Sequence, residues 1–77
     1  MTDFSVLDEH QLNELHRLGI KSLDRNIWTE EDHAECFRLI TILSGSQHVD
    51  TGCSACRNNA VNMLRGFYEE YTRGERD

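Results

Sequence analysis

The chain has 77 residues, 38% of them hydrophobic, which predicts a single small domain that buries only about 60% of the surface its unfolded form exposes. A core of this size usually needs a metal, a disulfide or a partner subunit for stability. Fourteen acidic against eight basic residues give a net charge of −6, the opposite of what contact with phosphate backbones requires, so we expect no direct nucleic-acid binding.

The sequence contains no signal for a membrane or for export. No apolar run approaches the roughly 18 residues that span a bilayer, and the first residues show no basic region leading into an apolar stretch. We therefore expect a cytoplasmic chain without membrane contact. Three cysteines, an odd number, favour a reducing compartment in which thiols are metal ligands, redox groups or core residues.

The first predicted helix spans about residues 8–18. Asp8 followed by Gln11 is typical of a capping box, and Gly19 predicts the end of the helix. Between them runs one apolar stripe, formed by Leu12, Leu15 and Leu18. A polar connector of about ten residues, ending near Trp28, follows and should lie against the core.

The second predicted helix spans residues 30–44. Thr29 is a suitable N-terminal cap, and the three carboxylates after it favour the positive end of the helix dipole. Gly45 predicts the end of the helix. Its apolar face is wide, as expected for a central helix: Cys36, Phe37, Leu39, Ile40 and Leu43.

The third predicted helix spans residues 54–72 and is followed by a solvated tail, residues 73–77. Its apolar residues recur at spacings of three and four: Cys56, Ala60, Leu64, Phe67 and Tyr71. No stretch alternates with period two over the length of a strand. The sequence therefore predicts an all-α fold, one three-helix domain that a metal could staple.

Cysteine and histidine residues form a candidate structural zinc site. Cys53 and Cys56 lie two residues apart at the start of the third helix, and His33 and Cys36 lie on one face of the second. The composite pattern, His-x2-Cys-x16-Cys-x2-Cys, is close to known zinc spacings, and Zn²⁺ accepts tetrahedral sulfur and nitrogen donors. His48, five residues before Cys53, is an equally reachable fourth ligand. We set aside His10 and His16 as surface groups.

The same thiols allow two other interpretations. Cys36 and Cys56 fall on apolar stripes and could be inert core residues, although that role gives no reason for Cys53. Alternatively, Cys53 and Cys56 form a redox pair, because free amides and the dipole at a helix start lower the pKa of a thiol. A thioredoxin-like context for this pair, a strand before it and a βαβ unit, is missing.

Protein contact is the remaining class of function that the sequence supports. The last turns of the third helix carry Phe67, Tyr68 and Tyr71, which exceed what a three-helix core needs and predict an interface for a protein partner or for a homo-oligomer. The acidic run of residues 30–35 allows a third hypothesis, an inhibitor that mimics nucleic acid. We expect no enzyme, since phosphate-binding loops and hydrolase motifs are missing.

The stretch from Thr51 to Arg57 contains Cys53-Ser54-Ala55-Cys56-Arg57 and opens a helix that continues with Leu64, Phe67 and Tyr68. It resembles a Cys-x-x-Cys-Arg segment in small uncharacterised proteins of tailed phages. The likeness covers about a quarter of the chain. It implies an accessory or virion component, located in the host cytoplasm or in the virion. Our leading hypothesis is a non-enzymatic interaction or structural subunit, with the dithiol redox protein as the alternative.

Overall fold

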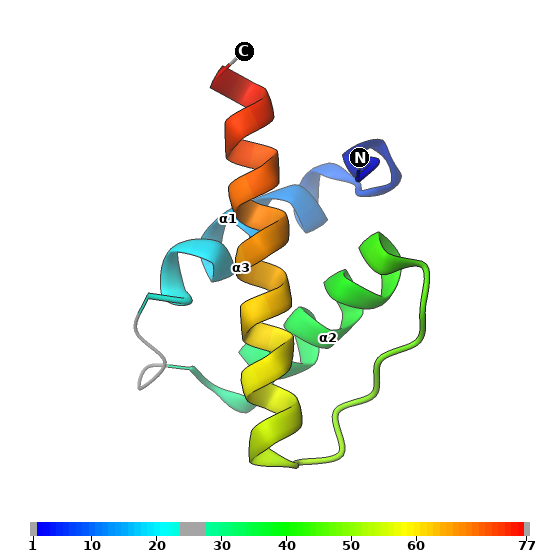
Figure 1. The fold of residues 1–77 in the computed structure, drawn as a ribbon, viewed down its shortest axis with the longest axis vertical. Coiled ribbons are helices and arrows are strands. Elements are labelled where there is room, and N and C mark those ends of the chain that lie inside the picture. Colours follow the sequence, from blue (N-terminus) through cyan, green and yellow to red (C-terminus); the bar gives the residue numbers. More distant parts are fainter. Residues whose placement is uncertain (1, 24–27, 77) are drawn as a thin grey trace.

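The computed structural model describes residues 2–23 and 28–76, with the side chains of residues 75 and 76 excepted. It confirms the predicted all-α class, because the described residues form three α-helices and no strand (Figure 1). The elements, in chain order, are the 3₁₀ turn η1 (Phe4–Val6), α1 (Glu9–Lys21), α2 (Glu30–Ser44) and α3 (Ser54–Arg76). Part of the predicted connector, residues 24–27, and Asp77 of the predicted tail lie outside the described residues.

The long helix α3 organises the fold. It packs against both α1 and α2, which also contact each other. In Figure 1, α1 passes behind the middle of α3, and the last turns of α3 extend beyond the rest of the molecule. The buried core lies where the three helices meet, and its members come from each of them and from the segment before α1: Leu7, Leu15, Leu18, Cys36, Phe37, Leu39, Ile40, Ala60 and Leu64.

Helix α1 begins as predicted but ends later. Asp8 and Gln11 form the expected capping box. The predicted end at Gly19 is wrong, because the helix continues to Lys21 and Gly19 is buried within it. Gly19 is instead a close-packing residue: a Cβ atom at this position would lie 2.2 Å from Cγ of Tyr68 on α3. Only a residue without a side chain lets the two helices approach this closely.

Helix α2 has the predicted bounds and cap. Thr29 and Asp32 form a reciprocal capping box, and Gly45 ends the helix with a positive φ of 74°. Asp32 is also buried and receives Lys21 Nζ at 2.5 Å and Arg17 Nη1 at 2.8 Å from α1. Burial would raise the pKa of Asp32, but hydrogen bonds from Lys21, the Thr29 N–H and Arg17 together hold it well below its ordinary value.

Helix α3 extends four residues beyond the predicted end, so most of the predicted solvated tail is helical. The N-terminal segment supports these late turns. Phe4 contacts the ring of Tyr71 edge-on, with the ring centroids 5.1 Å apart. Thr2 donates from its N–H and its hydroxyl to the two carboxylate oxygens of Glu70, both at 2.8 Å. These contacts hold the turn of α3 that leads into the predicted tail.

Candidate dithiol site

The loop that leads into α3 is held in place from both sides. On the α2 side, the Thr41 hydroxyl accepts the His48 N–H at 3.0 Å and donates to the His48 carbonyl at 3.2 Å. On the α3 side, the Asp50 carboxylate accepts the Gly52 N–H at 2.9 Å and the Arg57 Nε–H at 3.0 Å. Gly52 has a φ of 82°, a left-handed conformation that favours glycine. These contacts fix the direction from which the chain enters the helix.

Cys53 caps the N-terminus of α3. Its carbonyl accepts the Arg57 N–H at 2.9 Å, and its Sγ accepts the Cys56 N–H at 3.4 Å. This is the position at which Ser, Thr, Asp or Asn usually satisfies a free amide of the first turn. A thiol therefore takes the place of the usual oxygen, and the cap connects the two cysteines directly.

The two thiols of this pair differ in acidity. The pKa of Cys53 lies below its ordinary value, first because of the hydrogen bond from the Cys56 N–H, then because of hydrogen bonds from the Cys56 thiol and the Ala55 N–H. The pKa of Cys56 lies above its ordinary value, because its thiol donates to Cys53 and faces the charge of that sulfur. Both residues are free and exposed. Near neutral pH a larger fraction of Cys53 than of Cys56 is therefore in the thiolate form that attacks disulfides, and Cys56 keeps its proton to higher pH.

Cys36 is chemically separate from the pair. It is completely buried in the core, and its thiol donates to the Ala60 carbonyl at 3.5 Å. Burial, with a smaller effect from Asp50, raises the pKa of Cys36 to about 12. Cys36 is therefore the core residue that one of the sequence interpretations expected, whereas exposed Cys56 is not.

The structure does not assemble the predicted zinc site. Within residues 2–23 and 28–76, it brings together no group of three His, Cys, Asp or Glu side chains that could hold a metal ion. Cys36 is withdrawn into the core, while Cys53 and Cys56 lie at the surface. The His33 ring packs against Trp28, with the ring centroids 5.2 Å apart. The helical face that carries His33 and Cys36 is the packed face of α2, so Cys36 does not lie beside Cys53 and Cys56.

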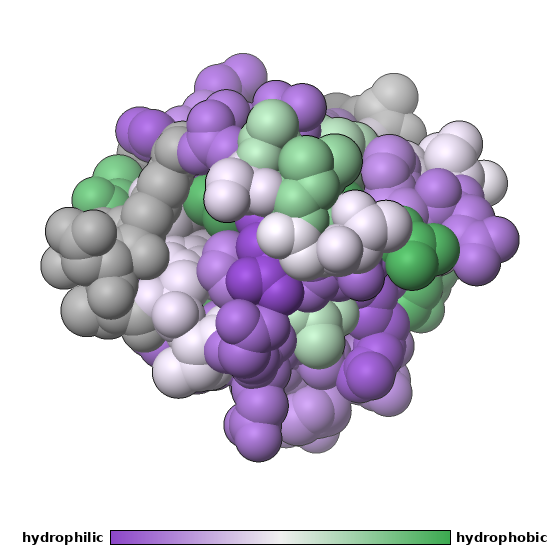
Figure 2. Space-filling model, turned by 90° about the horizontal axis from the view of Figure 1, so that it is seen from below, coloured by the Kyte–Doolittle hydropathy of each residue, from purple (hydrophilic) through white to green (hydrophobic). Residues whose placement is uncertain are grey.

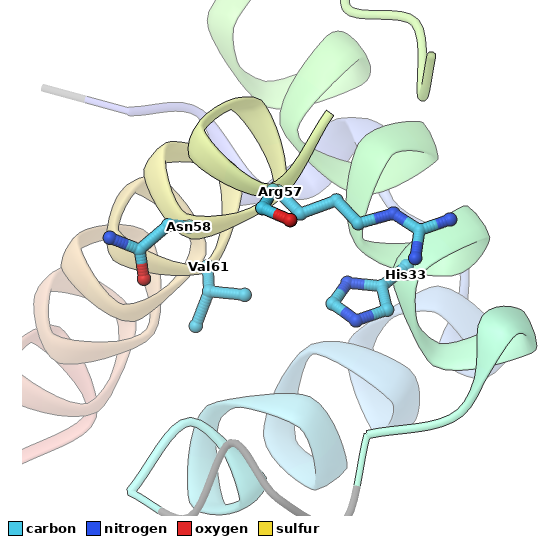
Figure 3. A pocket seen from close by; sticks show the side chains of 5 residues that line it. His33, Arg57, Asn58 and Val61 are labelled. Carbon is cyan, nitrogen blue, oxygen red and sulfur yellow. The ribbon is translucent and has the colours of Figure 1, made fainter. Parts of the chain in front are cut away.

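A polar pocket of about 250 Å³ lies between the starts of α2 and α3, and its lining comprises His33, Ser54, Arg57, Asn58 and Val61 (Figure 3). Figure 3 shows Arg57 reaching from α3 over the His33 ring toward α2. Its guanidinium binds Glu30 at 2.6 Å and Asp50 at 3.0 Å. Nδ1 of His33 is buried, and none of the residues that the structure describes offers it a hydrogen bond. Since two carboxylates already neutralise Arg57, the pocket offers no excess positive charge for an anion.

A second, more apolar hollow begins at the dithiol. This groove, of about 370 Å³, runs between α2, α3 and the loop that connects them. Its lining comprises Phe37, Ile40, Gln47, His48, Val49, Cys56, Asn59, Ala60 and Met63. Cys56 therefore belongs both to the thiol pair and to the groove wall. Val49 is 61% exposed at the groove. The sequence held one signal of this groove, a lone apolar residue in a polar loop.

The end of the molecule that carries the start of α3 is otherwise polar. Figure 2 views the molecule from this end and shows mostly hydrophilic residues, with hydrophobic ones in small, separate patches. A broad apolar face is therefore missing from this view. Any recognition here relies on a local hollow and on reactive groups rather than on a large apolar area.

The predicted aromatic interface is largely occupied by the chain itself. Phe67, Tyr68 and Tyr71 are all partly buried and pack against the core. The Tyr68 ring lies over Gly19 and meets the His16 ring edge-on, with the centroids 5.5 Å apart. The aromatic residues thus pack within the chain and support the long helix. The sequence pattern had indicated that they exceed what a three-helix core needs.

Comparison of the chain with protein-family models, with curated proteins and with solved structures returned no significant match. The resemblance to small phage proteins therefore stays a prediction. Among the described residues, no helix is both long enough and apolar enough to cross a membrane.

Proposed function

We propose that the protein is a dithiol protein that exchanges with disulfides through Cys53 and Cys56. The observation that carries this proposal is the helix cap, in which the Cys53 sulfur accepts the Cys56 N–H at 3.4 Å while both thiols remain exposed. The cap favours the thiolate of Cys53, and the next turn of the helix holds a second thiol beside it.

The chemistry requires two steps and a disulfide as oxidant. The Cys53 thiolate attacks one sulfur of the disulfide, forms a mixed disulfide and releases the other sulfur as a thiolate. Cys56 then gives up its proton to solvent, attacks the Cys53 sulfur and releases the second thiolate. The external disulfide is thereby reduced to two thiols, and the Cys53–Cys56 pair is oxidised to a disulfide. A dithiol or glutathione-type reductant reverses both steps.

The raised pKa of Cys56 suits the second position in this sequence. A thiol that stays protonated does not compete with Cys53 for the external disulfide. Once Cys53 is part of a mixed disulfide, its thiolate no longer accepts the hydrogen bond from the Cys56 thiol, and its negative charge is gone. Both effects of Cys53 that raise the pKa of Cys56 are thereby removed. Attack by Cys56 then becomes easier.

A second candidate function is the non-enzymatic interaction subunit predicted from the sequence, including a phage accessory or virion role. The observation that favours it is the apolar groove beside Cys56, not the aromatic end of α3. A partner that covers the groove would bury Val49, which the chain itself leaves 61% exposed. This candidate requires no change in the oxidation state of the thiols.

Equilibration with glutathione buffers of increasing oxidised fraction tests the dithiol proposal. Mass spectrometry after acid quenching should show a reversible loss of two hydrogens, with peptide mapping that locates the disulfide at Cys53–Cys56. Buried Cys36 is the internal control and should remain a free thiol throughout. Either single variant, Cys53→Ser or Cys56→Ser, should stop at a mixed disulfide with glutathione. A native protein whose exposed thiols form neither product would contradict the proposal.

A further inference from the structure

We infer that the groove beside Cys56 selects the disulfide substrate: an extended protein segment that carries a cysteine in a disulfide with an apolar residue next to it. This inference rests on the proposed dithiol function. It adds the class of substrate, and it assigns to Phe37, Val49 and Met63 a role in recognition that the thiol chemistry alone does not require.

The position of Cys56 connects the groove with the reaction. Cys56 lines the groove, and its backbone N–H contacts the Cys53 sulfur at 3.4 Å. For a chain whose sulfur bonds to Cys53, the groove is therefore within reach of its neighbouring residues. A small disulfide such as glutathione would meet the same thiol without filling the hollow.

The size and lining of the groove fit a peptide side chain. A volume of about 370 Å³ is at the lower end of ligand pockets, enough for one or two apolar side chains. Most of the wall is apolar, and the polar groups of Gln47, His48 and Asn59 can meet the amides of an extended backbone. A peptide segment uses both kinds of group.

Charge further restricts the segment. The chain carries a net charge of −6. Asp50 accepts the N–H of Gly52, the residue before Cys53, and Glu30 binds Arg57, the residue after Cys56. An acidic segment would meet repulsion as it approaches, whereas a neutral or basic one would not. The occupant is therefore a neutral or basic segment of another polypeptide rather than a second copy of this acidic chain.

Two short neutral peptides test the inference, each with one cysteine activated as a mixed disulfide with thionitrobenzoate and with either Leu or Ser beside the cysteine. Release of the coloured thiol gives the rate of attack by Cys53. Burial of the leucine side chain in the groove should make the Leu peptide react about tenfold faster than the Ser peptide. Val49→Lys should abolish this preference, because the charged side chain replaces an apolar wall residue of the groove.

Leu23→Lys is the matched control, because Leu23 is also an exposed apolar residue, at 74%, and does not line the groove. This variant should keep the wild-type preference. Equal rates for the two peptides, at a reactive Cys53, would overturn the groove inference and leave the dithiol function standing. A Cys53 no more reactive than a thiol in the unfolded chain would instead overturn the function. A product in which two copies of this chain are joined through Cys53 would indicate that the groove binds a second copy rather than another polypeptide, and it would also overturn the inference.

Discussion

Substitution of Gly19 by alanine tests the packing of α1 against α3. The added Cβ would lie 2.2 Å from Cγ and 2.5 and 2.6 Å from the two Cδ atoms of Tyr68, whereas an ordinary contact lies between 3.4 and 4 Å. The ring or the helix must therefore move by roughly 1.2 Å to restore contact at the nearest atom. Because Cγ is the ring atom nearest to the backbone, rotation of the side chain moves it little, and part of the shift falls on the helices.

The size of the effect follows from two opposing contributions. Overpacking of this kind costs about 1–3 kcal/mol, and the steepness of this clash favours the upper end. Alanine returns about 1 kcal/mol through its higher helix propensity. Gly19→Ala should therefore lower the free energy of unfolding by about 2 kcal/mol and the melting temperature by about 10 °C, a large part of the stability of a domain this small.

Urea unfolding followed by circular dichroism measures this change, and Gly66→Ala provides the matched control. Gly66 is also helical, but a Cβ there would meet no atom of the described residues within 4 Å, so this variant should gain up to about 1 kcal/mol. Adding Tyr68→Ala should relieve the clash, so that the double variant is more stable than the two single losses predict. A Gly19→Ala protein as stable as Gly66→Ala would refute the close contact between α1 and α3.

Three further results should follow. The depressed pKa of Asp32 stabilises the fold above the ordinary Asp pKa of about 3.9, and this stability is lost as the pH falls toward the lower folded value. In urea titrations, Asp32→Asn should therefore lower the free energy of unfolding by about 2 kcal/mol at pH 7 and weaken the loss of stability in acid. An unchanged acid profile would count against the buried ion pairs. Of the three thiols, Cys36 should resist labelling at pH 8 until denaturant is added, and labelling of all three in the native state would disprove its burial. Addition of a strong chelator should leave the helical circular dichroism spectrum unchanged, because the predicted ligands Cys36, Cys53 and Cys56 do not lie together at one point. Unfolding by the chelator would instead support the predicted zinc site.

Local signals in the sequence predicted the helices well wherever local interactions decide them. The caps at Asp8 and Thr29 and the end at Gly45 depend on hydrogen bonds within a few residues, and all three are confirmed. Gly19 misled because a glycine has two uses, the end of a helix and the close approach of a neighbour. The position of Tyr68, 49 residues after Gly19 in the sequence, decides which of the two uses applies.

The candidate site could be predicted only in part for a related reason. The spacing of Cys53 and Cys56 at a helix start was visible and gave the thiol pair. The zinc set required His33 and Cys36 to face the same point, yet the packing of α2 turns Cys36 into the core. The Arg57 link to Glu30 and the groove at Val49 depend on tertiary contacts between distant segments. Apart from the lone apolar Val49 in a polar loop, their residue types gave no signal.

The difference in acidity between Cys53 and Cys56 is the most direct test of the proposed dithiol function. Alkylation by iodoacetamide, followed residue by residue with peptide-mapping mass spectrometry from acid to alkaline pH, gives a midpoint for each thiol in the native protein. Cys53 should titrate below the ordinary value of about 8.5 and Cys56 above it, and both should return to the ordinary value in denaturant. Coincident midpoints for Cys53 and Cys56 in the folded protein would contradict the helix cap as the source of reactivity.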